Sequence, residues 1–151
     1  MALNIYTDGG CSGNPGPGGW AFVIVQKTYQ GEVVLTEKRG AEVNTTNNRM
    51  ELVAVISALK ALKSRKGLSR QAVVYTDSQY VQKGITEWIH KWKENSWRNS
   101  DKKPVKNQDL WLLLDNLAEE LTITWKWVKG HAGNVYNERC DYLTQKAIAE
   151  L

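Results

Sequence analysis

Four carboxylates of the sequence lie where strands are expected to end or helices to begin: Asp8, Glu51, Asp77 and Asp141. Asp8 closes the apolar run LNIYTD and Asp77 closes AVVYTD, and ligands of α/β sheets bind at the carboxyl ends of strands. Glu51 comes one turn into a helical pattern, and Asp141 falls in the expected first turn of the last helix. Carboxylates gathered without cationic partners repel one another unless they share hard cations, so this set predicts a site for Mg²⁺ or Mn²⁺.

Each of these carboxylates also has a purely structural explanation. Asp8 precedes two glycines and can start a turn, and Asn48 with Glu51 has the spacing of a capping box. Asp77 can cap the helix that follows it, and Asp141 is favoured electrostatically near a helix N-terminus. Taken singly, the structural explanations are the stronger ones. Taken together, the four acids favour a shared metal site.

His131 lies in the segment VKGHAGN, with glycine at positions 130 and 133. Because an imidazole titrates near neutral pH, a histidine beside a metal site can shuttle protons or assist the departure of product. The alternative is an ordinary loop histidine, and the residues alone leave both interpretations open.

The positive charge of the chain is concentrated in one segment. The net charge is +4, and residues 83–106 hold seven basic and three acidic side chains, so the rest of the chain is balanced. Three tryptophans, Trp88, Trp92 and Trp97, lie in the same segment. Basic residues interleaved with aromatic ones suit a polyanion whose sugars or bases pack on the rings. The charges alone fit equally well an amphipathic helix with its tryptophans in the core.

Length and composition indicate one globular domain over residues 1–151, with 42% hydrophobic and 24% charged residues. Apolar runs stay well short of the roughly 18 residues of a membrane span, and the first residues, MALNIYTDGG, lack the basic start of a signal peptide. Cys11 and Cys140 are far apart and in no metal-ligand spacing, which is typical of free thiols in a reducing compartment. We therefore expect a cytoplasmic monomer that does not bind membranes.

The order of the secondary-structure elements predicts the fold class. Short runs rich in β-branched and aromatic residues predict strands at positions 3–8, 20–26, 32–40, 72–77 and 122–128, the third of them at an edge. Apolar periodicity predicts helices from residue 49, from 78 toward 92, around 110–117 and over 137–151. A glycine-rich loop over residues 9–19 would join the first two strands. Hairpin strands followed by strands that alternate with helices predict an α/β fold with a mixed sheet covered by helices.

Six segments of the sequence resemble ribonuclease H of type 1, most closely its bacterial members. They span nearly the whole chain in the family's order: YTDGGCSGNPGPGGW, TTNNRMEL, YTDSQYV, GITEWIHKWK, DKKPVKNQDLW and WVKGHAGNVYNERCDYL. The resemblance implies a ribonuclease H-like fold, which is a five-stranded mixed sheet flanked by helices, with its third strand antiparallel.

The same resemblance implies endonucleolytic cleavage of the RNA strand of an RNA/DNA hybrid, leaving 5′-phosphate and 3′-hydroxyl ends. It puts Asp8, Glu51, Asp77 and Asp141 at the family's metal-binding positions and His131 at its auxiliary histidine. Two Mg²⁺ ions about 4 Å apart, with Mn²⁺ as a substitute, would activate the attacking water and stabilise the leaving 3′ oxygen. Asp8, on the expected central strand, would be the ligand shared by both ions.

The resemblance further implies how the hybrid is held. Neutral groups that sense the 2′-hydroxyls of RNA would come from Asn14, Asn47, Asn48 and Gln79. Thr46 and Asn107 would hold a phosphate of the DNA strand. Trp88 and the basic segment after it would bind the DNA strand electrostatically, through Lys91, Lys93, Lys102 and Lys103. The resemblance therefore favours nucleic acid as the partner of the basic segment over a helix whose charges only face solvent.

The sequence departs from close relatives in two places. Asn44 stands where many relatives have an arginine, two residues before Thr46, which predicts a weaker phosphate grip. The segment SRKGLSRQ lengthens the turn before the fourth strand. Two rival functions are compatible with the motifs of the family: a DNA-directed nuclease of the same fold, and a hybrid-binding protein without catalysis. The 2′-hydroxyl-sensing residues disfavour the first, and the complete set of carboxylates disfavours the second.

Overall fold

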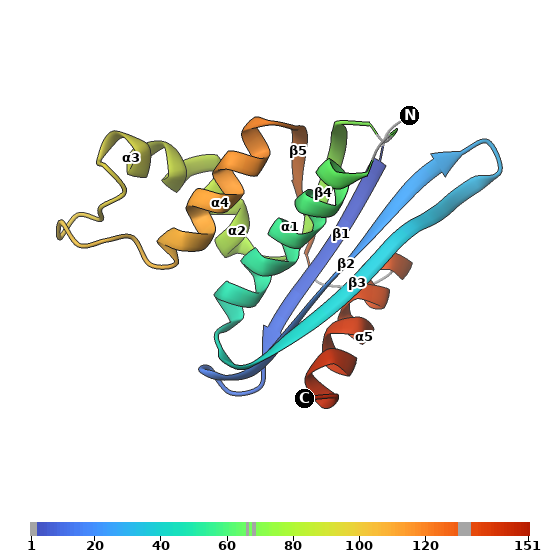
Figure 1. Ribbon diagram of the computed structural model, residues 1–151, viewed down its shortest axis with the longest axis horizontal. Coiled ribbons are helices and arrows are strands. Elements are labelled where there is room, and N and C mark those ends of the chain that lie inside the picture. Colours follow the sequence, from blue (N-terminus) through green and yellow to red (C-terminus); the bar gives the residue numbers. More distant parts are fainter. Residues whose placement is uncertain (1–2, 66, 68, 130–133) are drawn as a thin grey trace.

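The computed structural model of the chain describes residues 3–65, 67, 69–129 and 134–151. A five-stranded sheet with the order β3-β2-β1-β4-β5 runs through its centre (Figure 1). The strands are β1 (Leu3–Cys11), β2 (Gly16–Thr28), β3 (Gly31–Thr45), β4 (Gln71–Thr76) and β5 (Thr122–Trp127). The expected mixed sheet is confirmed, with β1 in the middle and β3 at an edge.

The direction of one strand corrects the sequence-based expectation. β2 pairs antiparallel with both β1 and β3, whereas the β1–β4 and β4–β5 pairs are parallel. The antiparallel strand is therefore the second along the chain, and the expectation that it is the third is wrong. Two consecutive hairpins reverse the chain twice, so that β3 runs in the same direction as β1.

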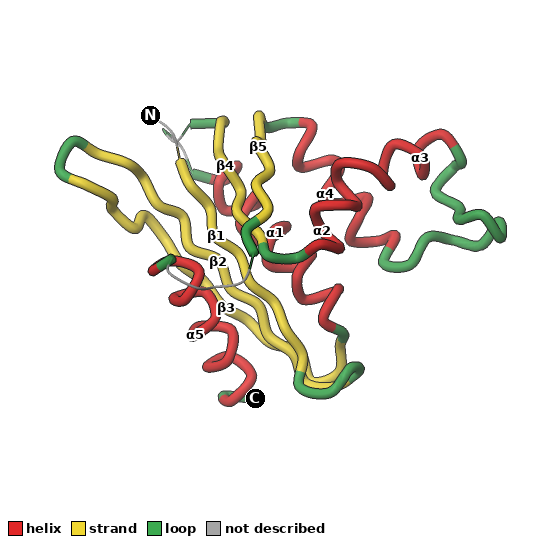
Figure 2. Tube along the Cα trace, turned by 180° about the vertical axis from the view of Figure 1, so that it is seen from behind, coloured by secondary structure: helices red, strands yellow, loops and turns green. Residues whose placement is uncertain are grey.

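The helices lie on both faces of the sheet (Figures 1 and 2). They are α1 (Asn47–Ser64), α2 (Gln79–Lys83), the π-helical turn η1 (Gly84–Trp88), α3 (Ile89–Glu94), α4 (Gln108–Glu119) and α5 (Val135–Ala149). α1 packs on β1 and β2 and beside α4, whereas α5 packs on β1, β2 and β3 from the opposite face. No helix in the described part of the chain is long and apolar enough to cross a membrane.

Alternating side chains of β1 divide the core into two layers. Leu3 and Ile5 belong to the cluster that is shared with α1 and α4, whereas Tyr6 belongs to a second cluster with Cys140 and Leu143 of α5. Because successive side chains of a strand point to opposite faces, Asp8 lies on the same face as Tyr6, toward α5. The central strand thus carries a carboxylate on the face that α5 covers.

The segment after β4 is a helix with a local change of pitch. The sequence predicts one helix from residue 78 toward 92, weakened at Gly84, and the structure has α2, η1 and α3 in direct succession. A Cβ atom at Gly84 would overlap the indole ring of Trp111, which is fully buried. The glycine is therefore required for close packing against α4. Beyond α3, the chain projects from the body before it returns to α4.

Candidate active site

The structure rejects each structural explanation for the four carboxylates. Asp8 forms no turn, because β1 continues to Cys11 and pairs Asp8 with Ala21. Helix α1 is capped by Thr46, whose hydroxyl accepts a hydrogen bond from the Arg49 amide at 3.2 Å, so Asn48 and Glu51 form no capping box.

The same holds for the two aspartates farther along the chain. Ser78, not Asp77, caps α2, and its hydroxyl accepts from the amide of Val81 at 3.1 Å. Asp141 is the seventh residue of α5 and not part of its first turn, so the expectation of a favourable helix-terminus position is wrong. The helix begins earlier than expected because Asn134 caps it, accepting hydrogen bonds from the amides of Tyr136 and Asn137.

The parallel pairing of β1 with β4 brings two aspartates to the same end of the sheet. Tyr6 is paired with Tyr75 in register, and their rings stack with centroids 4.8 Å apart. Asp8 and Asp77 each come two residues after these tyrosines, so both lie just beyond the paired stretch of the two strands, at the end where β4 finishes. Asp8 is only 8% exposed, and the backbone carbonyl of Asp77 accepts a hydrogen bond from the indole of Trp127 at 3.1 Å.

Gly9 brings the third carboxylate to the same place. A Cβ atom at Gly9 would overlap the backbone of Met50 and Glu51, so the missing side chain lets the first turns of α1 lie directly against β1. Burial first, and then the charges of Asp77 and Asp8, raise the pKa of Glu51 from 4.5 to about 8. Glu51 therefore lies in a pocket of concentrated negative potential with the other two acids.

Helix α5 carries Asp141 and packs on the same strand through the residue before it. The buried neighbour Cys140 packs on Tyr6, and its thiol donates to the Tyr6 carbonyl at 3.3 Å. Burial raises the pKa of the Cys140 thiol, and the charge of Asp8 raises it further. The charge of Asp8 therefore acts on the residue that directly precedes Asp141. His131, in the connection that precedes α5, lies outside the described residues.

The donor chemistry of these residues fits a hard divalent cation. All four side chains offer only carboxylate oxygens, which Mg²⁺ and Mn²⁺ prefer, and the thiol of Cys140 is bonded to backbone instead. Among the residues that the structure describes, no three His, Cys, Asp or Glu side chains are arranged to hold an ion. Burial first, and repulsion by Asp77 and Asp8 second, disfavour the charged form of Glu51, and a bound cation would offset both effects.

A pocket of about 320 Å³ gathers residues that the sequence analysis took from separate motifs. It is lined by Asn14, Thr46, Asn48, Lys106 and Asn107. The side-chain oxygen of Asn14 accepts from the amide of Asn47 at 3.2 Å, which links the β1–β2 connection to the start of α1. Four of the five lining residues were candidates for substrate binding. Lys106 was counted only within the basic segment and was not assigned a role.

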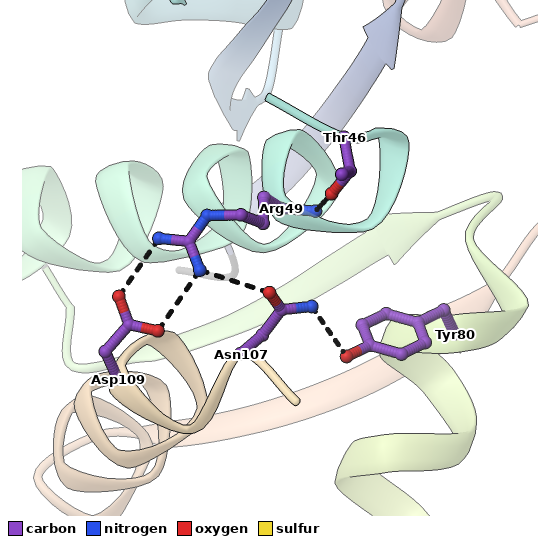
Figure 3. Close-up of polar contacts among 5 residues, drawn as sticks. All are labelled: Thr46, Arg49, Tyr80, Asn107 and Asp109. Carbon is purple, nitrogen blue, oxygen red and sulfur yellow. Dashed lines mark hydrogen bonds and ion pairs between the residues drawn. The ribbon is translucent and has the colours of Figure 1, made fainter. Parts of the chain in front are cut away.

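A hydrogen-bonded network behind this pocket was not anticipated (Figure 3). Arg49 of α1 donates from Nη1 to the side-chain oxygen of Asn107 at 3.1 Å and forms a two-pronged ion pair with Asp109, at 3.2 and 3.0 Å. The side-chain nitrogen of Asn107 donates to the hydroxyl of Tyr80 at 3.1 Å. The network therefore joins α1, α2 and the start of α4.

Two of the three tryptophans of the basic segment pack against the core. Trp92 and Trp97 pack against the core, and Trp92 lies edge-on against Trp111 at 5.3 Å, as the structural alternative predicts. Trp88 is half-buried and contacts Tyr80 at 5.7 Å, so it joins the outer end of an aromatic row.

The lysines of this segment differ in their surroundings. Lys91, Lys102 and Lys103 are exposed, as is Gln79 at the start of α2. Lys93 instead forms ion pairs with Asp115 at 2.9 Å and Glu119 at 3.2 Å, both on α4. Its charge is therefore balanced within the fold, and its visible role is to hold α3 against α4.

Comparison with known proteins finds one family throughout. The RNase H family model matches residues 1–149. The chain is 51% identical to the Ribonuclease H of Treponema denticola, with 100% of this chain and 99% of that protein covered. It is 54% identical to the Ribonuclease H of Wolbachia pipientis wMel, with 97% and 94% covered.

Solved structures agree with the observed fold. LC9-RNase H1, a type 1 RNase H with the type 2 active-site motif, superposes with a TM-score of 0.87 at 32% identity, over 99% of this chain and 72% of that one. LC11-RNase H1 in complex with an RNA/DNA hybrid gives a TM-score of 0.72 at 25% identity, over 98% and 97%. The resemblance noted in the sequence and the expected fold class are both confirmed.

Proposed function

Because this chain belongs to the RNase H family and is a nuclease, we propose that it hydrolyses the RNA strand of RNA/DNA hybrids, leaving 5′-phosphate and 3′-hydroxyl ends. The observation that carries the proposal is the placement of Asp8 and Asp77 on neighbouring parallel strands with Glu51 packed against Gly9, where burial first and then the charges of Asp77 and Asp8 raise the pKa of Glu51 to about 8. Residues 1–151 would act as one catalytic domain, as a monomer in the cytoplasm. The structure of LC11-RNase H1 with a bound hybrid supports the choice of substrate.

Two Mg²⁺ ions would be held by the four carboxylates, with Asp8 shared between them and with Mn²⁺ as a substitute. When bound, such ions activate a water molecule and neutralise charge on the leaving 3′ oxygen. The chain itself fixes the carboxylates: β1 and β4 set Asp8 and Asp77 side by side, and Gly9 admits Glu51. Asp141 would complete the set from α5, and His131 would carry protons to or from the site.

Discrimination of RNA from DNA would rest on neutral side chains next to the carboxylates. Two of them are the first residues of α1, one lies in the β1–β2 connection, and the fourth is the first residue of α2: Asn47, Asn48, Asn14 and Gln79. Their amides can donate to and accept from 2′-hydroxyls across the shallow minor groove. Duplex DNA lacks those hydroxyls, and it would therefore leave these groups unpaired.

The DNA strand would be held at two places. A backbone phosphate fits the pocket formed by Thr46, Lys106 and Asn107 with the neighbouring asparagines. Lys106 lines this pocket and would supply its positive charge. Asn44, which replaces the arginine of many relatives, does not line it. Farther along, the exposed lysines of the basic segment would bind the strand electrostatically beside Trp88, whereas the charge of Lys93 is already balanced by its ion pairs.

A labelled RNA strand tests the proposal directly. The protein is incubated with Mg²⁺ and the same RNA as a hybrid, as duplex RNA and as a single strand, with duplex DNA of matched sequence alongside. The proposal predicts RNA cleavage in the hybrid alone, with a phosphate on the new 5′ ends. Equal cleavage of duplex DNA would favour the rival DNA-directed nuclease, and binding without cleavage would favour the non-catalytic hybrid binder.

A further inference from the structure

The network behind the phosphate pocket fixes the orientation of one amide. Its two ends, the guanidinium of Arg49 and the indole of Trp111, can only donate hydrogen bonds. Arg49 donates to Oδ1 of Asn107, and Nδ2 of Asn107 donates to the Tyr80 hydroxyl (Figure 3). The same hydroxyl accepts from the indole of Trp111 at 2.9 Å. The group that faces Arg49 must therefore be the amide oxygen, and the amide nitrogen must lie on the other side.

Asn107 has the backbone position of a helix cap but does not use its side chain as one. It is the N-cap residue of α4 with left-handed dihedrals of φ 58° and ψ 29°, and its side chain makes no capping hydrogen bond. Asparagine is the favoured N-cap residue and also tolerates this conformation better than most residues. The side chain is thus withdrawn from the helix end and committed to the network, although it lines the pocket.

Orientation of this amide decides whether the pocket attracts an anion. While Oδ1 accepts from Arg49, Nδ2 donates one of its hydrogens to Tyr80. Its second hydrogen is available to a phosphate oxygen. If the amide were reversed, its carbonyl oxygen would face the phosphate and repel it. Thr46 and Lys106 line the same pocket, so a correctly turned Asn107 gives a site whose hydroxyl, ammonium and amide N–H can all donate.

Arg49 is placed to act through Asn107 and not on the phosphate. Its guanidinium is held by both oxygens of Asp109, which offset its charge, and Arg49 does not line the pocket. The ion pair is partly exposed, with side-chain exposures of 33% and 66%, so it adds little to folding stability. Resting on the function proposed above, we propose that Arg49 is a positioning residue that orients Asn107 to bind one phosphate of the DNA strand.

The test uses hybrids in which a single neutral methylphosphonate replaces one phosphate of the DNA strand, moved one linkage at a time. The wild-type protein should show one linkage where the replacement raises KM about tenfold, the effect of losing one charged hydrogen bond. Arg49→Met should raise KM for the unmodified hybrid about tenfold, with kcat within about twofold of the wild type. In this variant the methylphosphonate at that linkage should cause no further rise in KM. Arg49→Lys, which keeps a hydrogen-bond donor, should show part of the wild-type rise in KM at that linkage.

Three further variants separate the proposal from its alternatives. Arg39→Met removes an arginine of similar exposure, 36%, whose partner is Glu150, and is expected to keep the wild-type linkage profile. Asn107→Ala should reproduce Arg49→Met, and the double variant should be no worse than either single one. Asp109→Asn should raise KM, because the guanidinium loses its anchor; a phosphate-binding Arg49, freed from that carboxylate, would lower KM instead.

The outcomes distinguish this inference from the proposed function. Wild-type protein that leaves the RNA of an unmodified hybrid intact would overturn the function itself. Wild-type cleavage with an unchanged linkage penalty in Arg49→Met, or a lower KM in Asp109→Asn, would overturn only the positioning role. A general loss of stability in Arg49→Met, seen as a lower unfolding temperature, would not by itself erase the penalty at one linkage.

Discussion

Replacing Glu51 by glutamine should stabilise the protein in a way that depends on pH. Burial, followed by the charges of Asp77 and Asp8, raises the pKa of the folded-state carboxyl from 4.5 to about 8. Glutamine resembles the protonated acid in shape and carries no charge. The variant should therefore remove the cost of keeping this carboxylate among two others while preserving the packing of α1 on β1.

The sign of the effect follows from the two pKa values. Below about pH 4.5 the carboxyl is protonated in the folded and unfolded chains alike, so it contributes no difference. Between pH 4.5 and 8 the unfolded chain releases its proton and the folded chain keeps it, so the free energy of unfolding of the wild type falls as pH rises. Above pH 8 the loss is complete.

The size of the effect follows from the same values. Each tenfold change in proton affinity is worth about 1.4 kcal/mol, so the full shift corresponds to at most about 5 kcal/mol above pH 8 and about 3 kcal/mol at pH 7. Asp8 and Asp77 share protons with Glu51, which makes these values upper bounds. Divalent cations stabilise the charged form, so Mg²⁺ should reduce the difference and release protons when it binds at pH 7.

Urea unfolding of the wild type and Glu51→Gln at several pH values measures the difference directly. Glu94→Gln, which removes an exposed carboxylate at the end of α3, serves as the matched control. Calorimetric titration of Mg²⁺ in two buffers of different ionisation enthalpy counts the released protons. A stability difference between wild type and Glu51→Gln that is the same at pH 4 and pH 8.5 would refute the assignment of Glu51 to a carboxylate cluster.

Three other perturbations test separate parts of the site. Neutralising the exposed lysines of the basic segment, Lys91, Lys102 and Lys103, should raise KM and reduce the slope of log affinity against log salt by up to about 3; an unchanged slope would remove them from the binding surface. Gly9→Ala should lower the unfolding temperature and impair cleavage, because its methyl group overlaps the backbone of α1, and wild-type behaviour would mean that α1 is not held there. His131→Ala should slow turnover without abolishing it, and complete inactivity would assign it a more direct role.

Local patterns predicted most elements, and tertiary contacts explain where they failed. The apolar period of α1 and the compact run of β4 are properties of short segments, and both appear where expected. Glycine is disfavoured in strands, so the sequence predicted a loop over residues 9–19, yet β1 continues through Gly9 and Gly10 and β2 starts at Gly16. At Gly9 the reason is the close approach of α1, which no local pattern reveals.

The candidate site divides in the same way. Asp8 and Asp77 were predictable together because each ends a short apolar run of the sequence, and parallel pairing brings such positions to the same side of a sheet, although β1 itself continues to Cys11. The contacts of Arg49 could not be predicted from the sequence. Its partners Asn107 and Asp109 are far along the chain, and only the packing of α4 on α1 brings them close. Similarly, counting charges cannot show that Lys93 faces two carboxylates of α4.

The loss of a single carboxylate tests the metal site most directly. Asp8→Asn keeps the shape of the side chain at the centre of the sheet but weakens its hold on a divalent cation. On the labelled hybrid with Mg²⁺, we expect RNA cleavage at the level of the enzyme-free control. We also expect an unfolding temperature equal to or above that of the wild type, because a charge near Glu51 is removed. Cleavage at the wild-type rate by a folded Asp8→Asn protein would contradict the proposed metal site.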